Sequence, residues 1–404
     1  MIKANFTPMI ESTTVPPHLL DTFRQTYPHQ TPDIVARAPG RVNLLGGHVD
    51  VQEGLVLNIA IDREIWLAAA AGTDGHLEVY AADLGESATV ALDQLDSHAD
   101  VTGADLPRWA QYPAGVAWAL RRRDLPLPGM AVAFTGNVIM RAGLSSSAAV
   151  EEAFAIAWQA LSGWTLPPGE LAQVGREAER EYMGLGTGIQ DQFTALHGRR
   201  DHTLLIDCRT LDYQHIALPP QVRVVVCDTN TRRELVGSSY NTRAQDTHAT
   251  VQIIRQDLPE VKTLRDVSPE QLAAFRPRLT ESQFRRSRHM ISEIARVRAG
   301  GEALAAGDTG TFGGLMNESY RSARDDYGSS SPALDAMWDA ASQHPACLGA
   351  RYSGGGEAGA VVALVEAHAV DNFIAATARR YARATGRDGA LFPVDPADGA
   401  GVIR

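Results

Sequence analysis

The sequence predicts an α+β protein built from two lobes. Three observations support this class: β-branched, partly alternating runs lie in the first 140 residues, a charged and mainly helical stretch covers residues 232–345, and the remainder follows the order strand, loop, strand, helix, strand. A chain of 404 residues is long enough for two or three domains. We place the boundary near residue 210, which gives lobes at 1–210 and 211–404.

Local patterns give the order of the elements. Residues 147–161 form the clearest predicted helix, because Val150, Phe154 and Trp158 recur on one face and Gly163 is a natural stop. The other predicted elements before the helical stretch are a helix near 18–27, strands at 34–38, 55–61 and 64–71, a helix at 107–120, a strand at 131–138, a helix at 167–184 and strands at 202–208 and 222–229.

Composition excludes several classes of protein. A net charge of −11 without a basic block argues against nucleic acid or an anionic membrane as partner, and no apolar run approaches the ~18 residues of a membrane helix. Three scattered cysteines argue against a disulfide framework and fit a reducing cytoplasm, where we expect the protein. The only lysines are Lys3 and Lys262, so the lysine-bearing motifs of P-loop NTPases and protein kinases are absent.

The stretch RAGLSSSAAVEE, residues 141–152, is the candidate phosphate site. Glycine and small serines before a helix leave backbone N–H groups available to an anion, and the helix dipole favours negative charge there. Ser147 and Glu151 are one helical turn apart, so their hydroxyl and carboxylate share a face and can hold Mg²⁺. Taken alone, the motif is equally explained by a serine-capped helix with exposed glutamates.

Four ordered motifs together resemble the GHMP kinases and, among them, the galactokinase branch. The motifs are GRVNLLGGHVD (40–50), the serine-rich loop, GTGIQDQF (186–193) and GARYSGGGEAGAVVALV (349–365). The resemblance covers residue 34 to the C-terminus. It implies an enzyme, an ATP-dependent sugar 1-kinase that converts D-galactose and ATP to galactose 1-phosphate and ADP. It also implies an N-terminal lobe like ribosomal protein S5 domain 2, a ferredoxin-like C-terminal lobe, an active site in the cleft between them, and a monomer.

The resemblance assigns candidate roles to individual residues. Asp191 would accept or orient the proton of the anomeric hydroxyl, and Arg41 would stabilise charge on the transferring phosphoryl group. The sugar would be bound by Gly47, His48, Asp50, Gly188 and Tyr240. Mg²⁺ would be bound by Ser147 and Glu151. ATP would be bound by Trp109, Arg141, Gly143, Leu144, Ser145, Ser146, Ser147, Gly354 and Gly355.

The sequence departs from the galactokinase pattern at several positions. Gly47 stands where the family carries a glutamate that hydrogen-bonds the C6 hydroxyl of the sugar, and losing such a bond typically costs ~1.5–3 kcal/mol. Three substrates therefore stay open: D-galactose with the contact supplied by another residue, L-arabinose, which lacks C6, and D-galacturonate, whose C6 is a carboxylate. Arg141 either contacts a phosphate or points to solvent, and Glu357 and Tyr320 replace a family phenylalanine and histidine.

A non-catalytic sugar sensor on the same fold is the competing class of protein. The serine loop is complete, and Arg41 and Asp191 are both present, so the sequence favours the enzyme. A sensor would bind sugar and ATP without releasing ADP.

Overall fold

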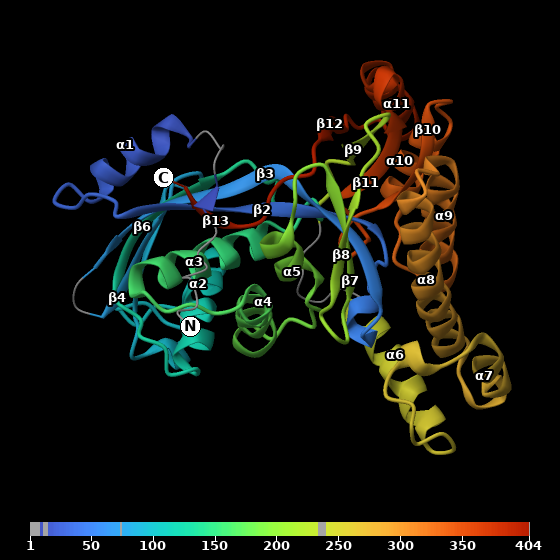
Figure 1. Cartoon of the computed structure of the whole chain (residues 1–404), viewed down its shortest axis with the longest axis horizontal. Coiled ribbons are helices and arrows are strands. Elements are labelled where there is room, and N and C mark those ends of the chain that lie inside the picture. Colours follow the sequence, from blue (N-terminus) through green and yellow to red (C-terminus); the bar gives the residue numbers. More distant parts are fainter. Residues whose placement is uncertain (1–8, 11–14, 73–74, 233–239, 404) are drawn as a thin grey trace.

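The computed structural model of the chain describes residues 9–10, 15–72, 75–232 and 240–403. Two β-sheets organise it, a larger one formed mainly by the first half of the chain and a four-stranded one formed by the second half (Figure 1). Helices cover both sheets, and α8 and α9 stand at the end of the molecule farthest from α1. Within the described part of the chain, no helix is long and apolar enough to cross a membrane.

The larger sheet has nine strands in the order β1-β13-β2-β3-β6-β4-β5, with β7 paired to β3 and β8 paired to β7. Its two long central strands, β2 and β3, pair antiparallel, and β2 carries the first half of the 40–50 motif. The strands are β1 (Met9–Ile10), β2 (Ile34–Leu45), β3 (Leu55–Ala71), β4 (His76–Ala81), β5 (Glu86–Ala91), β6 (Met130–Gly136), β7 (His202–Asp207), β8 (Tyr213–Ala217) and β13 (Gly401–Ile403).

Alternation along β3 gives this sheet two buried faces. Leu67 and Ala69 belong to the main core, whereas Trp66, Ala68 and Ala70 pack with α1 on the opposite face. The other helices of this lobe lie together on the main-core face (Figure 1). The helices are α1 (Pro17–Thr26), α2 (Arg108–Arg121), α3 (Ser146–Ser162), α4 (Pro168–Glu177) and α5 (Gln190–His197).

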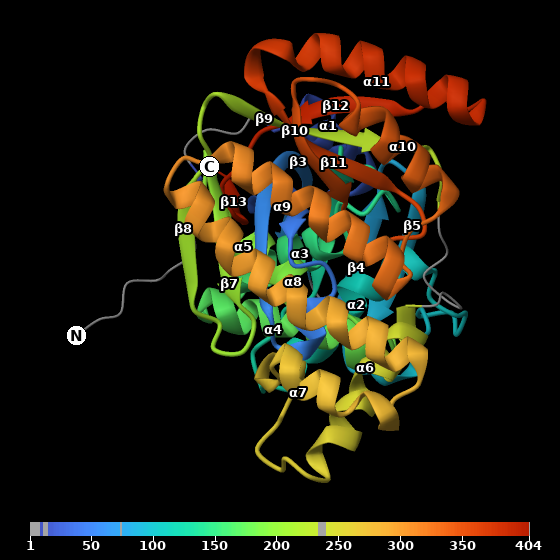
Figure 2. The same cartoon turned by 90° about the vertical axis from the view of Figure 1, so that its right-hand side faces the viewer.

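The smaller sheet is antiparallel in the order β10-β11-β9-β12, which is the ferredoxin-like arrangement expected for the second lobe. Its strands are β9 (Val222–Asp228), β10 (Cys347–Tyr352), β11 (Ala360–Glu366) and β12 (Ala390–Val394). The helices, seen in Figure 2, are α6 (Tyr240–Arg255), α7 (Pro269–Ala274), α8 (Glu281–Ala305), α9 (Thr309–Ser322), α10 (Pro332–Ser342) and α11 (Val370–Thr385).

The domain boundary near residue 210 stays a prediction. In the structure, β8 still pairs with β7 in the larger sheet, and the smaller sheet begins with β9. After β12 the chain returns to the larger sheet, where β13 pairs with β2 over Val35–Arg37. The first lobe is therefore closed by the last residues of the chain.

Most predicted elements are present with small shifts of their ends. The strand predicted at 34–38 continues to Leu45, and the two strands predicted between 55 and 71 form the single strand β3. The β4–β5 hairpin was not predicted, and it adds an edge to the larger sheet. The extension of β2 matters for function, because it places Arg41 and Asn43 on a strand, whereas His48 and Asp50 follow it in a turn and a short 3-10 helix.

Candidate active site

The serine-rich loop forms the turn into α3 as the phosphate-site prediction requires. Gly143 and Ser145 both have positive φ, 80° and 56°, and the helix begins at Ser146. A Cβ on Gly143 would lie 2.4 Å from the carbonyl oxygen of Ser353, so only glycine fits against the third motif. Gly354 makes the reciprocal approach, since its Cβ would lie 2.7 Å from the Cα of Gly143. The two glycine-rich loops, far apart in sequence, therefore pack directly on each other.

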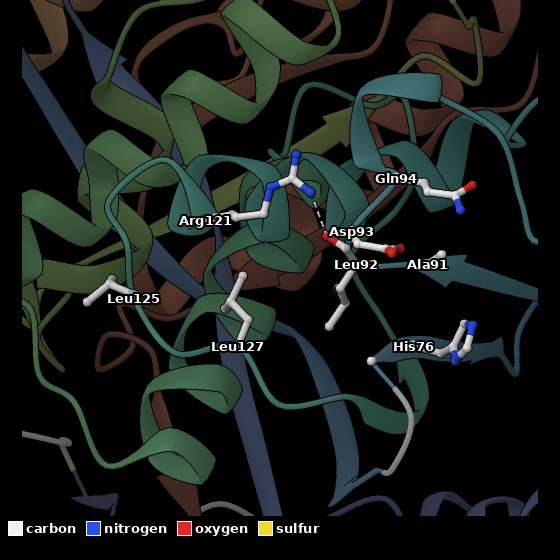
Figure 3. A pocket seen from close by; sticks show the side chains of 9 residues that line it. His76, Ala91, Leu92, Asp93, Gln94, Arg121, Leu125 and Leu127 are labelled. Carbon is white, nitrogen blue, oxygen red and sulfur yellow. Dashed lines mark hydrogen bonds between the residues drawn. The ribbon is translucent and has the colours of Figure 1, made fainter.

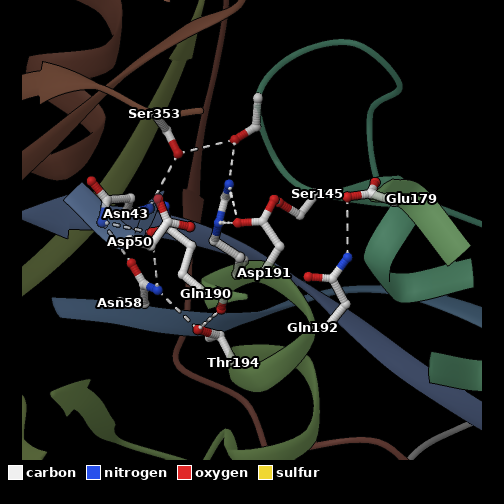
Figure 4. A network of polar contacts seen from close by, with 12 residues as sticks. Asn43, Asp50, Asn58, Ser145, Glu179, Gln190, Asp191, Gln192, Thr194 and Ser353 are labelled. Carbon is white, nitrogen blue, oxygen red and sulfur yellow. Dashed lines mark hydrogen bonds and ion pairs between the residues drawn. The ribbon is translucent and has the colours of Figure 1, made fainter. Parts of the chain in front are cut away.

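Arg41 and Asp191 form the contact that the catalytic prediction expects. The Nε of Arg41 donates to Oδ1 of Asp191 at 2.8 Å, and Nη1 of Arg41 donates to the Gly143 carbonyl at 2.9 Å (Figure 4). The Ser145 hydroxyl donates to Oδ2 of Asp191 at 2.6 Å. Arg41 is buried, while the Asp191 side chain is 27% exposed and accessible to a ligand. The Asp191 carboxylate thus lies between β2, which carries Arg41, and the serine-rich loop, which carries Ser145.

An amide network beneath Asp191 fixes this geometry and was missed from the sequence. Asn43 donates to Oδ1 of Asn58 at 2.7 Å, and Asn58 donates to the Thr194 hydroxyl at 2.9 Å. The Thr194 hydroxyl in turn donates to the Gln190 carbonyl at 2.6 Å (Figure 4). These buried side chains tie the start of α5, which carries Asp191, to β2 and β3. A sequence signal existed, because Asn43 and Asn58 each stand between apolar neighbours, in VNLL and VLNIAI.

On the sugar side, Asp50 and Gly188 are in direct contact. A Cβ on Gly188 would lie 1.9 Å from Oδ2 of Asp50, so the backbone at 188 approaches the carboxylate as no other residue could. Burial raises the pKa of Asp50 to about 6; the charge of Asp191 adds to this, and Gln190 and Arg41 oppose it. The charge of Asp191 therefore acts on Asp50, as expected for two carboxylates of one site.

His48 is buried and lies against aromatic rings of the second lobe. Its Nε2 is 3.2 Å from the Tyr352 hydroxyl, and its ring centroid is 4.8 Å from that of Tyr327. Tyr327 ends a π-helical segment, a distortion frequently found at functional sites. Tyr240 begins α6, but its side chain, like residues 233–239, lies outside the described part of the structure.

Glu179, which was not among the predicted ligands, interacts with the Ser147 hydroxyl. The two side chains hydrogen-bond, and Gln192 bridges the carboxylates of Glu179 and Glu151 at 3.2 and 2.9 Å. Glu151 is fully buried, and its Oε1 has no hydrogen-bond partner among the described residues. Burial raises the pKa of Glu151 well above its ordinary value, and the nearby Glu179 adds to the rise. Glu179 lies in a second π-helical segment that continues α4.

This oxygen-rich group can accept a Mg²⁺ ion. Within the described residues, no three His, Cys, Asp or Glu side chains form a complete metal cage. Mg²⁺ usually keeps several waters and binds through one or two carboxylates together with substrate phosphates, so a full protein cage is not required. The hydroxyl of Ser147 and the carboxylate of Glu179, beside the phosphate loop, match that donor set.

The predicted nucleotide residues differ in how they are placed. Trp109 is partly buried at the start of α2, where its Nε1 donates to Glu86 at 2.6 Å. Arg141 is exposed, with positive φ, at the start of the phosphate loop. The Gly355 carbonyl accepts a hydrogen bond from Arg243 at 3.3 Å, and Arg243 also pairs with Glu357 at 2.7 Å. Glu357 thus serves as an ion-pair partner of a buried arginine from α6.

A separate hollow of about 610 Å³ lies beside the β4–β5 hairpin and the end of α2 (Figure 3). None of the predicted site residues lines it, so it is not part of the candidate active site. Its lining residues are Gly75, His76, Ala91, Leu92, Asp93, Gln94, Arg121, Leu125 and Leu127.

Models of known families match three segments of the chain. The galactokinase galactose-binding signature matches residues 21–71. The N-terminal domain of the GHMP kinases matches residues 111–199, and their C-terminal region matches residues 302–383. The three matches follow the order of the motifs that build the site.

Individual relatives extend the likeness to nearly the whole chain. A galactokinase of Roseiflexus sp. (strain RS-1) is 42% identical over 385 residues, which cover 95% of this chain and 96% of the relative. A galactokinase of Chloroflexus aggregans is 41% identical over 378 residues, which cover 94% of this chain and 95% of the relative.

Solved structures share the fold. The crystal structure of Lactococcus lactis galactokinase complexed with galactose matches with a TM-score of 0.89 and 27% identity, and the match covers 95% of this chain and 98% of that one. Methanococcus jannaschii mevalonate kinase matches with a TM-score of 0.62 at 16% identity, over 92% of this chain and all of that one, and shows the fold alone. The chain therefore belongs to the galactokinases of the GHMP kinase family and is an ATP-dependent sugar kinase.

Proposed function

We propose that this enzyme transfers the γ-phosphoryl group of MgATP to the anomeric hydroxyl of D-galactose, with Asp191 and Arg41 as the catalytic residues. The observation that carries the proposal is the position of the Asp191 carboxylate. It contacts Arg41 and Ser145, of which Ser145 belongs to the phosphate loop, and it is coupled to Asp50 on the sugar side. Nucleophile activation and phosphate binding therefore converge on one group.

Asp191 orients the C1 hydroxyl and accepts its proton as the oxygen attacks phosphorus. The Ser145 hydroxyl, which now donates to Oδ2 of Asp191 at 2.6 Å, gives up that position to the sugar. Arg41 keeps its bond to Oδ1 and adds positive charge beside the transferring group, where phosphoryl transfer is most helped by positioning and charge neutralisation.

The N-terminus of α3 binds the phosphates through backbone N–H groups, since the loop lacks a lysine. Ser147 and Glu179 would hold Mg²⁺, and Glu151 is linked to Glu179 through Gln192. When bound, the ion neutralises phosphate charge during transfer. This assignment moves the predicted carboxylate ligand from Glu151 to Glu179.

The proposal is tested by ADP release with MgATP and a sugar panel of D-galactose, L-arabinose, D-galacturonate, N-acetylgalactosamine and D-glucose. We expect D-galactose to give the highest kcat/KM. The D191N variant should lose about 10²–10⁴-fold in kcat, the usual contribution of a general base, while still binding sugar. A tenfold preference for L-arabinose or D-galacturonate would reassign the substrate. Binding of both ligands to the wild type without ADP release would identify a sensor.

A further inference from the structure

Ser353 lies at the point where the second lobe reaches the catalytic residues. It directly follows β10 and precedes the glycines of the third motif, and its side chain is fully buried. Its hydroxyl donates to the Gly143 carbonyl at 3.0 Å and accepts the Asn43 N–H at 3.2 Å (Figure 4). One hydroxyl of the second lobe therefore connects β2, which carries Arg41, with the phosphate loop.

This connection extends a backbone contact between β2 and the phosphate loop. The Arg41 N–H donates directly to the Leu144 carbonyl at 3.0 Å. N–H groups two residues apart on a strand point to the same edge, so the Asn43 N–H faces the phosphate loop as well. There the hydrogen bond runs through the Ser353 hydroxyl to the Gly143 carbonyl. The side chain thus takes the place of a second direct backbone hydrogen bond.

The Gly143 carbonyl also determines where the Arg41 guanidinium lies. It accepts the Ser353 hydroxyl at 3.0 Å and Nη1 of Arg41 at 2.9 Å. The same guanidinium donates from Nε to Asp191 at 2.8 Å. A shift of this carbonyl would therefore turn Arg41 relative to Asp191. Phosphoryl transfer depends mainly on positioning and charge neutralisation, and a displacement of ~1 Å can cost about 100-fold in rate.

Arg351 of β10 contacts β2 from the same direction. Its Nη1 donates to the Asn43 carbonyl at 3.3 Å, so the N–H and the carbonyl of Asn43 both bind side chains of the second lobe. The Arg351 guanidinium also occupies the space that a Cβ at Gly47 would need. The backbone of β2 at Asn43 is thus held firmly, and Ser353 links it to the phosphate loop.

Glu293 of α8 contacts the loop that follows β2. Its carboxylate accepts the Gly46 N–H at 2.8 Å. Burial raises the pKa of Glu293, but the charges of Arg296 and Arg351 outweigh burial and lower this pKa to about 2. The carboxylate is therefore ionised. Glu293 and Arg351 hold the sugar side, whereas Ser353 bonds to both sides of the site.

We propose that Ser353 is a positioning residue for phosphoryl transfer. Its hydroxyl holds the phosphate loop at the distance from β2 at which one Arg41 guanidinium reaches both Gly143 and Asp191. The second lobe thereby sets the alignment of the catalytic pair, although it supplies neither residue of that pair. This inference rests on the proposed function, since it concerns the alignment of those same catalytic residues.

The test measures kcat and both KM values by ADP release, with MgATP and the best sugar of the panel. S353A should lower kcat roughly 10- to 100-fold, because the catalytic pair is misaligned. Both KM values should stay within about threefold of the wild type, because neither the Asp50 carboxylate nor the N-terminus of α3 is altered. S353T keeps the hydroxyl and should recover most of kcat.

A matched control separates alignment from loss of a buried hydroxyl. Thr203 on β7 is fully buried, and its hydroxyl donates to the Ile216 carbonyl at 3.1 Å. T203V should lower thermal stability as S353A does, with kcat unchanged. If S353A does not fold, S353C replaces it, because a thiol keeps a group of similar size that is only a weak donor and acceptor. S353C should then lower kcat by less than the loss expected for S353A.

The outcomes distinguish this inference from the proposed function. A kcat within about threefold of the wild type in S353A would overturn the positioning role. An equal loss of kcat in T203V, or a loss in S353A that S353T and S353C both fail to reduce, would overturn it as well. A rise in KM for ATP with unchanged kcat would make Ser353 a part of nucleotide binding instead. No ADP release by the wild type with any sugar would overturn the proposed function itself.

Discussion

On the phosphate side of the site, Arg41, Gly143, Ser145 and Asp191 contact one another and come from three short motifs of the first lobe. On the sugar side, the loop from Asn43 to Asp50 depends on side chains of the second lobe, which contact it from α8 and β10. The hydrogen bonds to Asp191 in the first region all come from the first lobe, although the phosphate loop also packs against Gly354 of the second lobe. The second region is built by both lobes. The 40–50 motif alone therefore does not determine which sugar is bound.

The largest expected effect comes from removing the carboxylate of α8 that contacts the sugar-side loop. The E293Q variant leaves Arg296 and Arg351 without a buried carboxylate, and breaking a buried ion pair typically costs about 3–5 kcal/mol. We expect a loss of stability of that size at pH 7 by chemical denaturation. The exposed pair of Glu281 with Arg276 gives the control, since E281Q should cost less than about 1 kcal/mol.

The same variant has a defined pH dependence. The pKa of Glu293 is about 2 in the folded protein and about 4.3 in an unfolded chain, so its stabilisation is fully present above the higher value. It is lost as the pH falls from about 4.3 toward 2. The stability difference between wild type and E293Q should shrink across this window. A constant difference would contradict an ionised Glu293.

A second substitution tests whether the sugar side can be disturbed without the phosphate side. In G188A the new Cβ would lie 1.9 Å from Oδ2 of Asp50 and force that carboxylate out of place. Losing one charge-assisted hydrogen bond to sugar should raise KM for sugar roughly 10- to 150-fold, with KM for ATP unchanged. Gly169 has only a distant neighbour, Phe193 at 3.9 Å, so G169A is the matched control. An equal rise in both KM values would show that the regions are not separable.

The pH profile offers a third, smaller effect on the sugar side. Burial raises the pKa of Asp50 to about 6, so in the free enzyme the carboxylate becomes protonated below that pH and loses its role as an acceptor. We expect kcat/KM for sugar to fall about tenfold per pH unit below 6, because this constant reports the free enzyme. The D50N variant should be weakly active and lack this inflection. An unchanged inflection in D50N would assign it to another group.

The two regions also differ in how far they could be predicted. Arg41, Asp191 and the glycines at 143 and 354 stand in recognisable motifs, and the structure brings them together. Arg351 also stands in a predicted motif, but its contact with Gly47 depends on how the lobes dock. Sequence spacing carries no such information. The α+β class and most elements followed from periodicity, whereas the return of β13 to the first sheet depends on tertiary pairing.

The proposed Mg²⁺ ligands illustrate the same limit within one lobe. Ser147 and Glu151 share a face of α3, so helical spacing favoured their pairing. The π-helical segment after α4 brings Glu179 to Ser147 instead, and Gln192 takes the carboxylate of Glu151. A single irregular turn in a neighbouring element therefore changed which carboxylate meets the hydroxyl, and periodicity cannot reveal such a turn.

The smallest expected effect concerns Arg141 at the start of the phosphate loop. Its side chain is exposed, and Arg141 already has positive φ, so alanine adds no new backbone strain. Surface substitutions usually change free energies by less than about 0.5 kcal/mol, so KM for ATP in R141A should stay within about twofold of the wild type. S145A, which removes a contact with Asp191, is the positive control on the same loop. A tenfold rise in KM for ATP in R141A would instead identify Arg141 as a phosphate ligand. Phosphate binding would then also require a residue that does not belong to the group of Arg41, Gly143, Ser145 and Asp191.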